Sequence, residues 1–172
     1  DSASASGQSL LSFDEHGHSS LVYAMQEEGE ESFEMRELHR PAGSDEWGEP
    51  TIVPTGPVES ASLQASDMGP HGATLLAFDP VSNSYQGSRL QVIHRGSHDA
   101  PWSEVVTLVP AEEGMKVSRV AVAALLDGHY LVTHRLQIGL NNETFGYAYY
   151  DGVNWVTGAL PAWDQLARDR CG

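Results

Sequence analysis

The sequence predicts an all-β fold built from three repeats. A glycine opens each repeat, a strand-like apolar run follows it, and a tryptophan comes 30, 30 and 27 residues after the glycine. The pairs are Gly17 with Trp47, Gly72 with Trp102, and Gly128 with Trp155. An internal period of about 55 residues is typical of stacked supersecondary units. The chain therefore divides into repeats at about 3–57, 58–114 and 115–172 of one domain.

Each repeat contains four short β-branched, aromatic or alternating apolar segments. Clusters of Gly, Pro, Asn, Asp and Ser separate these segments, as turns separate antiparallel strands. The sequence thus predicts twelve strands in three groups of four. The expected strands cover 9–13, 20–25, 33–39 and 50–53, then 61–66, 74–78, 89–94 and 104–109, then 118–126, 130–135, 145–150 and 156–160.

A four-stranded antiparallel unit of this length, with a tryptophan near the start of its outermost strand, resembles a β-propeller blade of the sialidase-like or bacterial neuraminidase-repeat type. The aspartate box of that family, Ser-x-Asp-x-Gly-x-x-Trp, is degenerate or absent here. Its nearest counterparts are 44–47, 97–102 and 151–155. The resemblance implies a propeller-like segment of three blades that presents its loops to a ligand.

Three blades are fewer than the four to eight with which propellers close. The expected partner is therefore another copy, which would give a six-bladed ring, or another chain or chain segment that supplies the missing blades. An irregular β-sandwich built from the same strands is the alternative fold.

The charge of the chain restricts the classes of partner that it can bind. A net charge of −15 with Lys116 as the only lysine argues against nucleic acid, whose phosphates require clustered cations. The chain has no apolar stretch of membrane-spanning length. The single cysteine, Cys171, allows no internal disulfide. These features predict a protein without a membrane-inserted segment, placed outside the cell or at its surface.

The repeat also selects candidate ligand-binding residues. His39-Arg40 and His94-Arg95 occupy equivalent positions before their tryptophans, and Tyr149-Tyr150 lies near the matching point of the third repeat. Such residues build a binding rim or form hydrogen bonds with the next blade. Arg119 joins the candidates because it lies on an expected innermost strand. Trp47, Trp102 and Trp155 are expected to be structural, each covering the space between neighbouring sheets.

The eight histidines do not follow a metal-binding pattern along the sequence. His16-Gly17-His18 is the tightest group and His129 with His134 the next, but neither has a zinc-site spacing. The sequence therefore predicts no metal site and no cofactor.

The function expected from these features is a binding or scaffold module for a carbohydrate or protein partner. The first alternative is a fragment or subunit of a sialidase-like glycoside hydrolase, in which Arg119, Glu59 and Asp67 would converge near the axis. The second alternative is a structural subunit of a multi-chain assembly, with apolar outward faces on its end blades. No nucleophile motif or phosphate-binding loop is present in the chain. We therefore expect the chain to bind a partner rather than to act as an enzyme by itself.

Overall fold

A computed structural model describes residues 4–26, 28–58, 62–80, 87–139 and 142–160. These residues form three four-stranded antiparallel sheets, which confirms the all-β prediction and its three groups of four strands. Two predicted features, Cys171 and Glu59, lie outside the described residues. Within the described residues, no helix is long and apolar enough to cross a membrane.

The strands of each sheet pair in chain order, and we call the three sheets blades 1, 2 and 3. Blade 1 contains β1 (Ser4–Phe13), β2 (Ser19–Gln26), β3 (Glu34–Arg40) and β4 (Thr51–Ile52). Blade 2 contains β5 (Ser62–Met68), β6 (Thr74–Asp79), β7 (Leu90–Arg95) and β8 (Val106–Val109). Blade 3 contains β9 (Met115–Ala124), β10 (Tyr130–Ile138), β11 (Asn142–Tyr150) and β12 (Trp155–Leu160).

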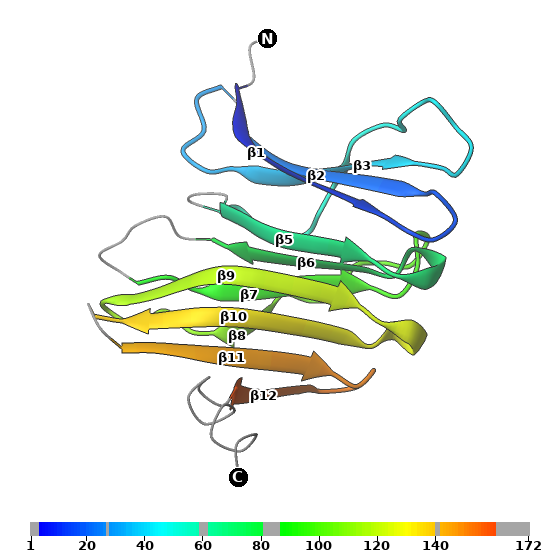
Figure 1. Cartoon of the computed structure of the whole chain (residues 1–172). Coiled ribbons are helices and arrows are strands. Elements are labelled where there is room, and N and C mark those ends of the chain that lie inside the picture. The colour runs from blue at the N-terminus through cyan, green and yellow to red at the C-terminus, as the bar shows by residue number, and fades with distance from the viewer. Residues whose placement is uncertain (1–3, 27, 59–61, 81–86, 140–141, 161–172) are drawn as a thin grey trace.

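The blades stack face to face along the chain (Figure 1). The first strand of each blade contacts the first strand of the next, β1 with β5 and β5 with β9, as innermost strands of a propeller do. The stack does not close on itself among the described residues, so blades 1 and 3 each have one face without a neighbouring blade. The chain is an open arc of propeller-like blades.

Three strands begin at least three residues before their expected starts: β1 at Ser4 instead of 9, β9 at Met115 instead of 118, and β11 at Asn142 instead of 145. Strand β9 begins at Met115, three residues before the expected start, because Met115 and Val117 are buried while Lys116 between them is exposed. The pairing of β9 with β10 shifts in register between Ser118 and Ala121. This shift interrupts the alternation of buried and exposed residues by which a strand is recognised in a sequence.

The repeated glycines close the turns between the first and second strands of the blades. Gly17, Gly72 and Gly128 have φ of +90°, +76° and +73°, a region that side chains with a Cβ rarely adopt. This shared backbone requirement explains why glycine opens every repeat.

Two apolar cores join the blades. Between blades 1 and 2, Val22 and Met35 pack with Phe78 and Ile93, and all four are fully buried. The second core lies between blades 2 and 3 and contains Leu75, Ala77, Val92, Tyr130, Val132 and Ala148. Because successive residues of a strand point to opposite faces, the middle blade is buried on both sides.

The repeat gives each blade a preceding and a following face. The residue five positions after the repeat glycine packs against the next blade, as Val22 and Ala77 do. The residue four positions after that glycine packs against the previous blade, as Leu76 and Val132 do. The preceding face of blade 1 and the following face of blade 3 therefore have no neighbour, and we call them open faces. By strand register, the open face of blade 1 carries Leu11, Phe13, Leu21, Tyr23, Met25, Leu38, Arg40 and Ile52, together with the ion pair of Arg36 and Glu34. The open face of blade 3 carries Leu131, Thr133, Arg135, Phe145, Tyr147, Tyr149, Val156 and Leu160.

Candidate functional site

A buried ion pair joins blades 1 and 2. Arg95, at the end of β7, donates from Nη2 to Oε1 of Glu37 on β3 at 2.6 Å, and the side chains are 8% and 1% exposed. The same carboxylate oxygen accepts the hydroxyl of Ser20 at 2.5 Å. The guanidinium also lies over the Trp102 ring, 4.6 Å from its centroid. Arg95 is therefore held by a carboxylate from the preceding blade and by an indole from its own blade.

Arg40 occupies the equivalent position in blade 1 and repeats part of this arrangement. Its guanidinium lies 5.4 Å from the Trp47 centroid and donates to Ser19 at 3.1 Å, just as Arg95 donates from Nε to Thr74 at 3.4 Å. Among the described residues no carboxylate pairs with Arg40, and its buried Nε has no hydrogen-bond acceptor. Arg40 thus lacks the group that a preceding blade supplies to Arg95.

The tryptophans show the same difference between blade 1 and the other two blades. Trp102 packs against the core between blades 1 and 2, and Trp155 packs against the core between blades 2 and 3. Trp47 is 38% exposed. Each of the two packed tryptophans thus contacts a core that its blade shares with the preceding blade, and Trp47 belongs to the blade without one.

His94 and Tyr150 meet in an aromatic group between blades 2 and 3. The His94 ring lies 4.9 Å from Tyr130 and 4.7 Å from Tyr150, and Tyr150 lies 5.2 Å from Trp155. Burial lowers the pKa of His94. Burial, with Tyr150 nearby, raises the pKa of Tyr130 to about 12. These neutral rings act as packing groups at the blade junction.

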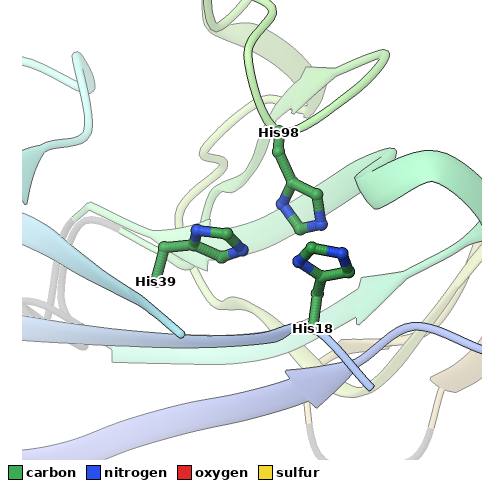
Figure 2. Close-up of side chains that lie close together, drawn as sticks. All are labelled: His18, His39 and His98. Carbon is green, nitrogen blue, oxygen red and sulfur yellow. The ribbon is translucent and has the colours of Figure 1, made fainter. Parts of the chain in front are cut away.

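His39 belongs to a different group, which contains three histidines from three separate segments (Figure 2). His18 follows the turn after β1, His39 lies near the end of β3, and His98 lies in the loop after β7. The ring centroids are 4.2 Å apart for His39 and His98, 4.4 Å for His18 and His98, and 5.5 Å for His18 and His39. One nitrogen from each ring lies within 4.8 Å of the other two. We call these residues the histidine cluster.

Asp14 borders the histidine cluster and shapes its turn. Its Oδ1 accepts the backbone N–H groups of His16 and His18 at 2.9 Å each, and its Oδ2 lies 3.5 Å from His98 Nε2. Burial alone would raise the pKa of Asp14, but the two backbone hydrogen bonds and the neighbouring His18 and His98 hold it below its usual value. A buried carboxylate thus faces the cluster in its ionised form.

Among the described residues, three ring nitrogens of the cluster have no hydrogen-bond partner, whereas Nδ1 of His18 accepts the backbone N–H of Ala42 at 3.3 Å. Nε2 of His39 and both nitrogens of His98 are buried and make no hydrogen bond within the described part of the chain. Burial, followed by repulsion from the other histidines and from Arg95, lowers the pKa of His39, and burial with His18 lowers that of His98. Neutral imidazoles offer the free lone pairs that metal ions bind.

The remaining sequence candidates lie apart from one another. Arg119 is on β9 as expected but is exposed, with a φ of +51°. Asp67 accepts the backbone N–H of Ala124 in blade 3 at 2.8 Å, so it ties two blades together. The hydroxyl of Tyr149 lies 2.7 Å from Nδ1 of His129. The structure therefore distributes the predicted rim residues over the histidine cluster, the blade junctions and the open faces.

Sequence reasoning did not select His98, Asp14 or Glu37, and it predicted no metal site at His16-Gly17-His18. The repeat identified His39 because an equivalent histidine stands in blade 2. No spacing along the chain could connect His18 with His98, because their approach depends on how blade 2 stacks on blade 1.

Comparison with protein-family models and with curated proteins found no match to this chain. The class of the protein therefore rests on its architecture, an open arc of three propeller-like blades.

Proposed function

We propose that this chain is a binding and scaffold module that joins a second copy of itself, open face to open face, in a six-bladed ring. The observation that carries the proposal is Arg40, which repeats the stacking and hydroxyl contact of Arg95 but lacks the carboxylate partner that blade 1 supplies to Arg95. A further blade against the open face of blade 1 would supply the missing acceptor.

The exposed apolar side chains of blade 1 support the same conclusion. Leu11, Phe13 and Ile52 are 51%, 53% and 60% exposed. Residues at the equivalent face of blade 2, such as Leu76 and Phe78, are fully buried against blade 1. Large apolar side chains that are exposed on one face mark an interaction site when polar groups surround them. A partner blade would bury the face of blade 1 as blade 1 buries the face of blade 2.

The direction in which the blades stack favours a head-to-tail contact between copies. The open face of blade 3 is a following face and that of blade 1 is a preceding face, so they are the two halves of one blade junction. Tyr147 of blade 3 stands at the position that Glu37 holds in blade 1, and its hydroxyl is the acceptor we expect for Arg40. Two such junctions close a ring of six blades, within the usual range for propellers.

Light scattering across a range of concentrations tests this assembly. We expect a mass near twice 18.6 kDa, and we expect Leu11→Glu to give a monomer. Leu11 lies in register with Leu21 and Leu38 on the open face, so a carboxylate there would be buried unpaired in the junction. The matched control is Val153→Glu, a 78% exposed position in the turn before β12, which should stay dimeric. A wild-type chain that is monomeric at every concentration would overturn the proposal.

Carbohydrate binding at the loops, glycoside hydrolysis by a completed ring, a sialidase-like ancestry and an extracellular location remain predictions from the sequence. A glycan-array screen of the assembled protein is the first test of the ligand.

A further inference from the structure

We propose that the histidine cluster is a zinc site in which His18, His39 and His98 are the ligands and Asp14 is a positioning residue. This inference is independent of how the blades assemble, because all four residues come from blades 1 and 2 of one chain.

The donor set suits zinc. Imidazole nitrogen is a preferred ligand of Zn²⁺, and three protein ligands with a fourth position for water or another group form a common tetrahedral arrangement. A tetrahedral ion with bonds of about 2.0–2.1 Å holds its ligand nitrogens roughly 3.4 Å apart. The nitrogens of the cluster lie within 4.8 Å of one another, so small rotations of the side chains bring them to a shared ion.

The unpartnered nitrogens point to an occupant. Polar atoms buried in a protein are nearly always hydrogen-bonded, and an exception needs an explanation. Here Nε2 of His39 and both nitrogens of His98 are buried without hydrogen bonds among the described residues. The three rings converge with their nitrogens toward a common region (Figure 2). A metal ion would satisfy Nε2 of His39 and one nitrogen of His98, and the other nitrogen of His98 would be left to pair with Asp14.

The surroundings also fit a cation. A histidine that binds a metal commonly donates its other ring N–H to a carboxylate, which fixes the ring and strengthens the ligand. Asp14 Oδ2, buried and 3.5 Å from His98 Nε2, is placed for this contact. The positive charge of Arg95 is nearby, but Glu37 pairs with it. The ion would connect the loop after β7 to blade 1 at the rim of the arc.

The local backbone holds His98 in place. A Cβ at Gly72 would collide with the His98 ring, so the ring packs directly over the backbone of the turn after β5. The position of this ligand is therefore set by packing before any ion arrives, which reduces the entropy lost on binding.

The test is zinc binding by the full chain, stripped with a chelator and titrated by calorimetry, with bound metal counted by mass spectrometry. We expect one equivalent per chain in the wild type, and its loss in His39→Gln and in His98→Gln. The matched control is His16→Gln, because His16 lies in the same turn but is exposed and outside the cluster. This variant should bind like the wild type.

Asp14→Asn separates positioning from ligation. Asparagine keeps the side-chain oxygen that accepts the two backbone N–H groups of the turn, but it lacks the charge beside His98. Loss of such a supporting carboxylate typically weakens metal affinity by about 10–100-fold. We expect this weakening with the stoichiometry unchanged.

Cobalt gives a readout that requires no variant. Co²⁺ in the wild-type site should show the strong visible absorption of a tetrahedral ion, and zinc should displace it. The proposal is overturned if the wild type takes up no stoichiometric zinc, if the cobalt spectrum is that of the six-coordinate aqueous ion, or if folded His39→Gln and His98→Gln bind zinc as the wild type does.

Discussion

Replacing Glu37 by glutamine should destabilise the chain strongly. The substitution keeps the volume and the acceptor oxygen for Ser20, but it removes the negative charge that faces Arg95 at 2.6 Å. The guanidinium would stay in the junction between blades 1 and 2, where it is 8% exposed, with no counter-charge. The perturbation is thus confined to one charge at one interface.

The magnitude follows from the burial of both groups. Breaking a buried pair by removing one partner costs about 3–5 kcal/mol, and the contact of Arg95 with Trp102 offsets part of that loss. For a domain of this length each kcal/mol corresponds to roughly 2–4 °C in Tm. We therefore expect Tm to fall by about 6–20 °C.

The assay is equilibrium unfolding in urea at a fixed protein concentration, with Tm measured by circular dichroism. The companion variant, Glu37→Leu with Arg95→Met, removes both charges, and we expect its stability to lie within about 1 kcal/mol of the wild type or above it. The matched control, Arg40→Met, removes the equivalent arginine that pairs with no described carboxylate. At a protein concentration at which the wild type is monomeric, it should cost less than about 1 kcal/mol.

Two results would refute this reasoning. If Glu37→Gln costs no more than Arg40→Met, the pair does not hold the junction. If the double variant is as unstable as Glu37→Gln, packing rather than the uncompensated charge sets the loss.

Two further predictions concern single side chains. Burial lowers the pKa of His94 among Tyr130 and its neighbours, so the unfolded chain binds a proton more readily than the folded one and stability should fall as pH drops below about 6.5. His94→Phe should make the free energy of unfolding depend less on pH between 7.5 and 5, and an unchanged slope would contradict the assignment. Gly72→Ala should cost at least about 1–3 kcal/mol from its positive φ, and more because a Cβ there strikes His98. Gly128→Ala, with a similar φ and open space around it, should cost less, and equal losses in urea unfolding would argue against the contact with His98.

The sequence predicted the architecture because the repeat is a local signal. Glycine with positive φ at each turn and an apolar run after it are properties of neighbouring residues, so Gly17, Gly72 and Gly128 mark the blades without any knowledge of packing. Strand ends were harder to place where a register shift interrupts the alternation, as on β9.

The site was predicted only where it follows the repeat. His39 and Arg40 were selected because His94 and Arg95 match them, but the repeat says nothing about what each pair contacts. Glu37 and Arg95 are 58 residues apart, and their pairing is a product of stacking between blades. The histidine cluster combines a turn, a strand and a loop, so only the fold could assemble it.

The pattern of β2 argues for an occupied open face. A strand with one face toward water usually alternates apolar and polar residues, and β2, in an end blade, would be such a strand in an isolated arc. Yet Leu21, Tyr23 and Met25 point to the open face while Val22 and Ala24 point to blade 2. Strand β2 thus has apolar residues on both faces, as does β6 of the middle blade, which is buried along its whole length. A sequence shaped for burial on both sides is what a blade in a closed ring requires, and the mass of the wild-type protein in solution decides whether a second copy provides that cover.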